Sequence, residues 1–550
     1  MLPDMYDTIK VLGIVAWFLG SIAAWAAESN PADRETHSSE TKPNTLLPEP
    51  TGLQYKPLHE VLDSIITSPE LQNALIGAQV ISITTGKTIF EHNPDQLINP
   101  ASVSKIFTTS AALCLLSPSY RFKTEIYIKQ RPTNGVVKGP MYVKGYGDPL
   151  MINERLTHLA QELKAVGIDK INGPIVLDST YFDNVTEGPG WDQDDSSRPY
   201  MAPMGALSLN FNSAAVLVFP GSSIGAKAQL SILPDSDHFI LENLTKTSYG
   251  RTWVRIKVFE KGNRTRVQVK GRVSIHHPGS RTYFRVTSPT MYFGRSFRQA
   301  LNRAGIKTRR TIKLGTTPEW MDRFYVQSSP ELGELVRKVN KRSQNFMAEQ
   351  LFKTIGAWLL GPPASWHKGQ QAMAAFLDEE IGIAPSTYVL HNGSGLNDVN
   401  RVTPRQVVKV LQYIWKRFDV WPDFVASMAV AGSDGTVAHR FIHPALKRTM
   451  RLKTGSLRHV RALAGYVHTR GGEVLAFSIL ISRYQCSGRM TISIINRFAS
   501  ALSEADADHM LVEEIRMPEK NDLIELSPLT GQGPKEGHED AAIPIGENEK

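Results

Sequence analysis

The sequence predicts an α/β (α+β) fold in which one mixed unit is split by an inserted β-rich block. Two observations indicate the unit: a hairpin pattern and an apolar helix precede residue 126, and helices with a second hairpin follow residue 325. A third observation indicates the insertion, because residues 126–325 contain short strand-like runs separated by Gly and Pro. We therefore expect residues 57–125 and 326–505 to fold together as one domain.

The first outer segment, residues 57–125, opens with a hairpin signal. Ala78 to Ile83 alternates toward a strand, Thr85-Gly86-Lys87 supplies a turn, and a second apolar run follows. Ser102 to Leu116 then carries apolar side chains at helical spacing. We expect a β-hairpin followed by a buried helix.

The middle and the second outer segment differ in character. In residues 126–325, runs such as Gly173 to Leu177 and Trp253 to Val258 predict strands. In residues 326–505 we expect three helices, a hairpin around a Gly-Gly turn and a closing amphipathic helix. These elements are expected at Glu331–Val339, Phe346–Leu360, Pro404–Phe418, Ala462–Val467, Val474–Leu480 and 489–504.

Both ends of the chain differ from this core. Val11 to Ala27 is an apolar run ending in Ala24-Trp25-Ala26, so residues 1–26 are expected to be a secretory signal peptide or an uncleaved membrane anchor. Residues 27–56 are predicted to be a disordered linker, and residues 506–550 a polar, disordered tail. Export places the protein in the periplasm or cell envelope.

Net charge and composition limit the kinds of partner and ligand that we expect. The formal charge is +9 and the pI is about 9.2, which favours acidic partners. We find no Arg/Lys stripe interleaved with aromatics, so nucleic acid is not expected, and the basic residues are expected to be scattered over a solvated surface. There are two cysteines and no C-x-x-C, H-E-x-x-H or Asp-rich loop, so neither a metal site nor a cofactor is expected.

Ser102-Val103-Ser104-Lys105 places a Ser and a Lys at positions i and i+3. If Ser102 lies in the first helical turn, both side chains share one face. A serine hydroxyl needs a neighbouring base to become a nucleophile, and Lys can serve as that base if its pKa is lowered. The same pattern occurs at Ser39–Lys42 and Ser365–Lys368, but only Ser102 lies between a hairpin and an apolar helix.

Two further motifs stand in the second outer segment. Ser343-Gln344-Asn345 precedes a predicted helix, and Lys453-Thr454-Gly455-Ser456 precedes the final hairpin. Taken singly, the first fits a polar helix start and the second a polar strand edge. A second S-x-N, Ser208-Leu209-Asn210, lies in the β-rich block.

In the order S-x-x-K, S-x-N, K-T-G, the three motifs are typical of penicillin-binding proteins and class A β-lactamases. The sequence resembles the S13 peptidases, D-alanyl-D-alanine carboxypeptidase/endopeptidases of the penicillin-binding protein 4 type. The 238 positions between Lys105 and Ser343 select this branch, since its members carry inserted domains there. The resemblance covers about residues 57–505 and implies a serine β-lactamase/DD-peptidase-like transpeptidase domain. Further similar stretches are Gly145–Pro149, Ala206–Asn212, Gly393–Leu396, Arg401–Pro404, Ala431–Thr436 and Ala462–Tyr466.

The resemblance implies catalytic roles for four residues. Ser102 attacks the carbonyl between two D-alanines and forms an acyl-enzyme, and Lys105 accepts its proton. Ser343 and Asn345 relay a proton to the leaving amine and hold the substrate amide. Water completes hydrolysis.

It also implies a substrate-binding strand. Lys453 and Thr454 hold the terminal carboxylate of the peptide, and Lys453 also lowers the pKa of Lys105. The backbone N–H groups of Ser102 and Ser456 form the oxyanion hole. Peptidoglycan peptides are the implied substrates, and β-lactams, which trap the acyl-enzyme, are the implied inhibitors. Carboxypeptidase and endopeptidase action require the same residues, so both remain open.

Three positions depart from the family pattern. Gln344 stands where Asp is usual, Asn392 replaces the Asp before Gly-Ser-Gly, and Ser456 replaces the commoner Thr. The Gln344 and Asn392 departures keep open the alternative of a catalytically impaired wall-binding or scaffold protein. A class A β-lactamase is a further alternative, but the E-x-x-L-N motif is missing: Ala206, Arg298 and Gly393 occupy the Glu position before the three Leu-Asn pairs.

Overall fold

The computed structural model describes residues 55–193, 196–506 and 512–513. The predicted signal or anchor, residues 1–26, lies outside the described residues, as do most of the expected linker and tail. Within the described part of the chain, no helix is both long and apolar enough to cross a membrane. Two residues of the expected tail, Val512–Glu513 (β22), pair with Tyr55–Lys56 (β1) at the end of the expected linker.

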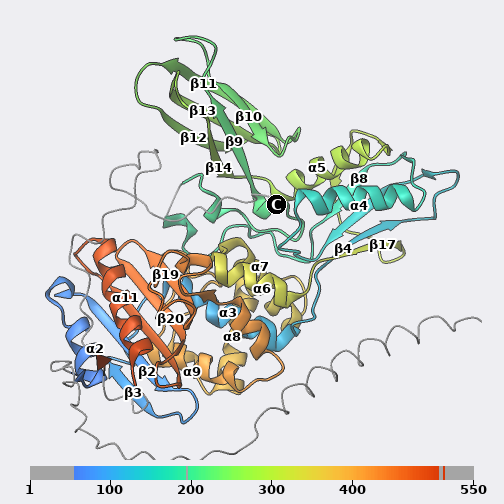
Figure 1. The fold of residues 1–550 in the computed structure, drawn as a ribbon. Coiled ribbons are helices and arrows are strands. Elements are labelled where there is room, and N and C mark those ends of the chain that lie inside the picture. Colours follow the sequence, from blue (N-terminus) through green and yellow to red (C-terminus); the bar gives the residue numbers. More distant parts are fainter. Residues whose placement is uncertain (1–54, 194–195, 507–511, 514–550) are drawn as a thin grey trace, which may run out of the picture. The chain divides into compact units, whose positions relative to one another are not determined.

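A six-stranded antiparallel sheet joins the two outer segments of the chain (Figure 1). Its order is β18-β19-β20-β21-β2-β3, so the early hairpin pairs with the late one through β2 and β21. Ala78 of β2 lies opposite Ile479 of β21. The strands are β2 (Leu75–Ser82), β3 (Thr88–His92), β18 (Ala429–Val430), β19 (Met450–Leu457), β20 (Val460–His468) and β21 (Val474–Ser482).

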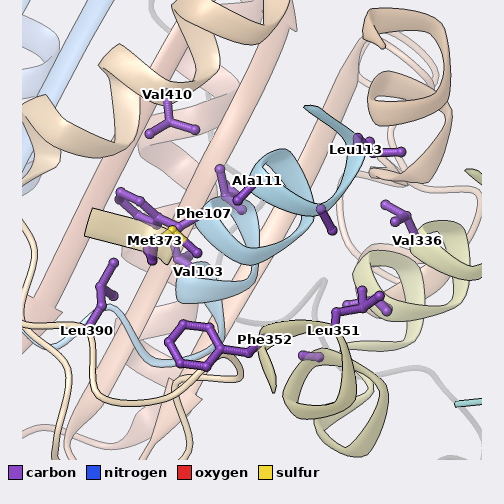
Figure 2. Packing of buried hydrophobic residues seen from close by; sticks show 14 of the residues in the cluster. Val103, Phe107, Ala111, Leu113, Val336, Leu351, Phe352, Met373, Leu390 and Val410 are labelled. Atoms are coloured by element: carbon purple, nitrogen blue, oxygen red, sulfur yellow. The ribbon is translucent and has the colours of Figure 1, made fainter. Parts of the chain in front are cut away.

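Helices cover both faces of this sheet. One face packs against α2 (Leu58–Ile66) and α11 (Gly488–Glu504) in a single apolar cluster. A second cluster fills the other face, where α3 is buried on nearly all sides, as expected of a central helix. Figure 2 shows Phe107 and Ala111 of α3 among side chains of the surrounding helices. These helices are α3 (Ser104–Leu116), α6 (Leu332–Arg342), α7 (Asn345–Leu360), α8 (Trp366–Ala375), α9 (Pro404–Trp415) and α10 (Trp421–Ser427).

Residues 126–325, the expected inserted block, also contain helices, which their Gly- and Pro-separated strand pattern did not predict. Its five-stranded sheet, in the order β16-β8-β6-β4-β17, packs against α4 (Asn153–Ala165) and α5 (Pro289–Arg303). A separate small sheet has the order β15-β7-β5. The strands are β4 (Lys123–Ile128), β5 (Val136–Val137), β6 (Met141–Gly145), β7 (Lys170–Ile171), β8 (Ile175–Asp178), β15 (Lys307–Thr308), β16 (Ile312–Leu314) and β17 (Asp322–Ser328). Both β4 and β17 cross the expected block boundaries, because pairing continues a few residues beyond them.

Two three-stranded sheets complete the block, with orders β10-β9-β14 and β11-β13-β12. Alternate residues of β13, Val267, Val269 and Val273, are fully buried in the same apolar cluster as Val216 and Val218 of β9. The strands are β9 (Ser213–Phe219), β10 (Gln229–Leu233), β11 (Phe239–Ser248), β12 (Trp253–Glu260), β13 (Thr265–Ser274) and β14 (Ser280–Arg285). One face of β11-β13-β12 is therefore buried and the other is left to solvent.

Most predicted elements of the outer segments are present within a few residues. Helix α9 ends at Trp415 rather than Phe418, whose side chain is almost fully exposed. The predicted helix at Ser102 begins as a separate 3₁₀ turn, η2 (Ala101–Val103), before α3 starts at Ser104. This turn positions the first candidate residue.

Candidate active site

Lys105 connects three segments of the chain through its amino group. Its Nζ atom donates to Ser102 Oγ at 2.9 Å, to Asn345 Oδ1 at 2.7 Å and to the backbone carbonyl of Ser394 at 2.7 Å. Ser102 is half-buried, whereas Lys105 is completely buried. The two residues share one side of the η2–α3 junction, as their spacing predicts.

Burial sets the protonation of Lys105. Removal from water lowers its pKa to about 7, although the negative charge of Glu349 acts in the opposite direction. An ammonium has three protons and no acceptor, whereas the neutral amine has two protons and a lone pair. Asn345 Oδ1 and the carbonyl of Ser394 take the two protons of the neutral amine. Its lone pair is then directed at the hydroxyl of Ser102, which is the arrangement that a base requires.

Ser343 lies between two helices in a left-handed conformation. It ends α6 with φ of 54°, and α7 begins two residues later at Asn345. A non-glycine residue in this region carries backbone strain, which clusters at functional sites. Its Oγ atom accepts a hydrogen bond from Lys453 Nζ at 2.9 Å. Gln344, where the family usually has Asp, caps α7 by accepting from the backbone N–H of Phe346 at 3.1 Å.

Lys453 is the second buried lysine of the site. Besides Ser343, its Nζ donates to the carbonyl of Thr454 at 2.7 Å. Burial and, secondarily, the charge of Lys105 hold the pKa of Lys453 well below its usual value. We expected the charge of Lys453 to lower the pKa of Lys105. Burial is instead the main cause of the lowered pKa at both lysines, and the charge of Lys105 lowers the pKa of Lys453 further.

The strand that carries Lys453 lies directly against the turn that carries Ser102. A Cβ atom at Gly455 would come within 2.5 Å of the carbonyl oxygen of Pro100 and 3.2 Å of Ala101 Cβ. Only glycine permits this approach. Thr454 Oγ1 donates to Thr436 Oγ1 at 2.8 Å, and Ser456 is half-buried on the same strand.

Glu349 is a buried residue that the sequence analysis missed. Its carboxylate accepts from the backbone N–H of Ser394 at 2.9 Å, the N–H of Gly393 at 3.1 Å and the indole N–H of Trp366 at 2.8 Å. These bonds fix the loop whose Ser394 carbonyl accepts from Lys105. The available signal was its position four residues after Asn345, on the same face of a helix with few other charges.

The side chain of Asn392 forms hydrogen bonds within the same loop. It accepts from the backbone N–H of Gly395 at 2.9 Å and donates through Nδ2 to the carbonyl of Leu396 at 3.0 Å. An Asp carboxylate could not make the second bond. The charge that the Asn removes is present nearby in Glu349, so the substitution leaves the loop with a carboxylate and a full set of hydrogen bonds.

The other sequence matches have ordinary structural roles. Ser365 caps α8 by accepting from the backbone N–H of Lys368 at 3.1 Å, and Lys368 Nζ donates to the carbonyl of Gly361. Ser208 lies in a turn of the inserted block and bonds the carbonyl of Gly205. The match at Ser39 lies outside the described residues. Among the residues that are described, no group of His, Cys, Asp and Glu is arranged to hold a metal ion.

Residues 58–502 match the D-Ala-D-Ala carboxypeptidase 3 (S13) family. The chain belongs to this family. It is a serine-type DD-peptidase, as its sequence predicts, and the predicted fold class is confirmed. The alternative of a catalytically impaired scaffold protein is not favoured.

Relatives of this S13 chain align with it over most of their length. It is 29% identical over 489 residues to a D-alanyl-D-alanine carboxypeptidase of Actinomadura sp., which covers 86% of this chain and 89% of the relative. It is also 29% identical over 424 residues to the carboxypeptidase DacB of Haemophilus influenzae, covering 76% and 86%. The crystal structure of penicillin-binding protein 4 from Haemophilus influenzae superimposes with a TM-score of 0.71 at 26% identity, covering 80% of this chain and 97% of that one.

Proposed function

We propose that Ser102 is the nucleophile of this DD-peptidase and that neutral Lys105 is its base. The observation that carries the proposal is the contact between the two side chains at 2.9 Å with the pKa of Lys105 near 7. Ser102 gives its proton to Lys105 as its Oγ bonds to the carbonyl carbon between two D-alanines. The released D-alanine leaves as the amine, and water then hydrolyses the acyl-enzyme at Ser102.

The other site residues divide into proton transfer and substrate binding. Ser343 carries a proton to the leaving amine and Asn345 holds the substrate amide, supported by their hydrogen bonds to Lys453 and to Lys105, respectively. Lys453 and Thr454 bind the terminal carboxylate of the peptide, whose negative charge favours the charged form of the buried lysine when substrate is bound.

The oxyanion hole is assigned to two backbone N–H groups, those of Ser102 and Ser456. The close approach of strand and turn at Gly455 supports this pairing. Loss of one such donor typically slows the reaction by about 10²–10³.

Residues 57–125 and 326–505 are proposed to form the DD-peptidase domain, with residues 126–325 inserted into it. The protein acts on peptidoglycan peptides in the periplasm or cell envelope, reached through the signal or anchor at residues 1–26. Free D-Ala-D-Ala ends and D-alanyl cross-links require the same residues, and digestion of purified cross-linked muropeptides, with analysis of the products, decides between carboxypeptidase and endopeptidase action.

β-Lactams are proposed to acylate Ser102. A crystal structure of the Haemophilus influenzae protein is described as complexed with a novel β-lactam, and it superimposes on this chain with a TM-score of 0.67 at 25% identity. Without the E-x-x-L-N glutamate, release of the acyl group is expected to be slow.

The test labels wild-type protein and the Ser102→Ala variant with a fluorescent penicillin and assays both on a soluble D-Ala-D-Ala peptide. We expect labelling and D-alanine release from the wild type alone. An unlabelled wild type, or a labelled variant, would contradict the assignment of Ser102. Rapid turnover of nitrocefin by the wild type would contradict slow deacylation.

A further inference from the structure

The positive charge of the chain is concentrated in one part of the sequence. Residues 239–285 contain 11 Lys and Arg against 2 Asp and Glu, and the rest of the chain contains 51 of each sign. The formal net charge of +9 is therefore accounted for by this segment. The expectation that the basic residues are scattered is wrong, because strand pairing brings these side chains together.

Six of these cations lie on one face of the sheet β11-β13-β12. In antiparallel register, Arg255 lies opposite Lys270, Lys257 opposite Gln268 and Trp253 opposite Arg272. In parallel register, Lys246 lies opposite Arg272 and Leu244 opposite Lys270. Since side chains alternate between the two faces of a strand, all of these point away from the buried valines of β13. The basic face comprises Lys246, Arg255, Lys257, Arg266, Lys270 and Arg272.

Most of this charge has no partner within the protein. Glu242, the one acidic residue on the face, pairs with Arg266 at 2.6 Å and accepts from Gln268. Among the residues that the structure describes, the other five cations form no ion pair, and all five are exposed. Figure 1 shows the three strands β11, β13 and β12 side by side in this sheet.

The arrangement opposes folding stability. Arg255 faces Lys270 directly, and Lys246 faces Arg272, although like charges opposite one another destabilise a sheet. Local arrangements that cost stability are typical of functional sites, so these like-charge pairs indicate a binding surface. An anionic partner would relieve the repulsion.

Two aromatic side chains mark the ends of the face. Trp253 is 51% exposed and Phe259 is 46% exposed, and both lie on β12 on the same side as Arg255 and Lys257. Only cations separate them on that side of the strand. The two rings are separated along β12 by cations, so they do not form the single apolar face that an interfacial amphipathic helix inserts into a membrane. Separate flat rings with cations between them fit an extended polymer that carries both sugars and charge.

We propose that the basic face binds the peptidoglycan strand itself, at a surface distinct from the catalytic residues. This inference rests on the proposed function, because a peptide that ends in D-alanine carries a free carboxylate and a glycan strand bearing many such peptides is a polyanion. The cations contact these carboxylates and the two rings contact sugar faces. The enzyme is thereby held on its insoluble substrate while individual peptides reach Ser102.

The test uses the full chain with three cations replaced, Arg255→Gln, Lys270→Gln and Arg272→Gln. A matched control replaces three exposed cations outside the face, Lys87→Gln, Lys338→Gln and Lys416→Gln, and so removes the same charge. Both sets are made in the Ser102→Ala background so that nothing is digested. Binding is measured by cosedimentation with purified peptidoglycan free of lipid and protein, at low and at high salt, and with phosphatidylglycerol vesicles.

We expect the face variant to bind peptidoglycan about tenfold more weakly than the parent, with less dependence on salt. The control variant should bind as the parent does. The melting temperature of the face variant should be equal or higher, since a repulsion is removed. Equal loss in both variants, no loss in the face variant, or binding of the parent to the vesicles but not to peptidoglycan would overturn the proposal.

A soluble D-Ala-D-Ala peptide separates this inference from the proposed function. With Ser102 restored, the wild type and both variants should hydrolyse the peptide with the same kcat and KM. Absence of hydrolysis in all three would contradict the proposed function, whatever the binding result. Hydrolysis that is impaired only in the face variant would contradict a surface separate from the catalytic residues.

Discussion

Lys453 donates a hydrogen bond to Ser343 at 2.9 Å, across 110 positions of sequence. The same distance separates Lys105 from Ser102, so the site holds two lysine–serine pairs with both lysines fully buried. The pairs differ in their surroundings. Lys105 has the carboxylate of Glu349 near it, whereas Lys453 has only the charge of Lys105. This asymmetry suits one lysine to proton transfer and the other to anion binding.

Replacing Glu349 should move the pH dependence of acylation. The Glu349 charge raises the pKa of Lys105, so Glu349→Gln lowers that pKa further. Because the neutral amine is the active form, acylation should then begin at lower pH than in the wild type. The measurement is the rate of penicillin acylation against pH, with circular dichroism to establish folding.

Glu379→Gln, an exposed acid outside the site, is the control and should leave the profile in place. A folded Glu349→Gln variant whose profile coincides with that of the wild type would mean that Glu349 does not act on Lys105.

Lys453→Met should separate activity from stability. The variant loses the cation for the substrate carboxylate, so kcat/KM on a D-Ala-D-Ala peptide should fall about 10- to 100-fold. Burial and the charge of Lys105 oppose protonation of Lys453 in the folded protein and hold its pKa well below its usual value, so replacing it by an apolar side chain should raise the free energy of unfolding by about 1 kcal/mol or more. Denaturant titration gives the second quantity.

Lys353→Met is the matched comparison, because Lys353 is also buried but is paired with Asp183 at 2.6 Å. Its loss should destabilise the protein by about 1–3 kcal/mol. If both lysine variants are destabilised alike, the account of Lys453 as a group whose burial costs stability is wrong.

Gly455→Ala should disable the site through the backbone. The new methyl group would meet the carbonyl of Pro100 at 2.5 Å and push β19 away from the turn that carries Ser102. We expect acylation to slow about 10²-fold or more and stability to fall by about 1–3 kcal/mol. Gly250→Ala, where the new atom meets nothing within 4 Å, should change neither. A Gly455→Ala variant with normal acylation would contradict the requirement for close approach.

The motif residues of the site could be predicted from the sequence, but the contacts that hold them in place could not. Ser102, Lys105, Ser343, Asn345 and Lys453 carry local patterns that place them on a turn, a helix start and a strand. Periodicity also predicted the central helix and the hairpins of the main sheet.

Contacts between distant segments left no such pattern. In the sequence, Glu349 is an ordinary helix residue. Its role depends on hydrogen bonds from the backbone N–H groups of Gly393 and Ser394, which lie more than 40 positions away. The left-handed φ of Ser343 follows from how α6 meets α7. The basic face arises only when β11, β12 and β13 pair in register.

The most direct test of the central claim is the rate of Ser102 acylation by a β-lactam from pH 5 to pH 10, measured as the second-order rate constant on the wild type. If neutral Lys105 is the base, the rate should rise with pH along a single limb with its midpoint at the Lys105 pKa of about 7. A rate that is independent of pH over this range, or that rises only near the ordinary lysine pKa of about 10.4, would contradict it.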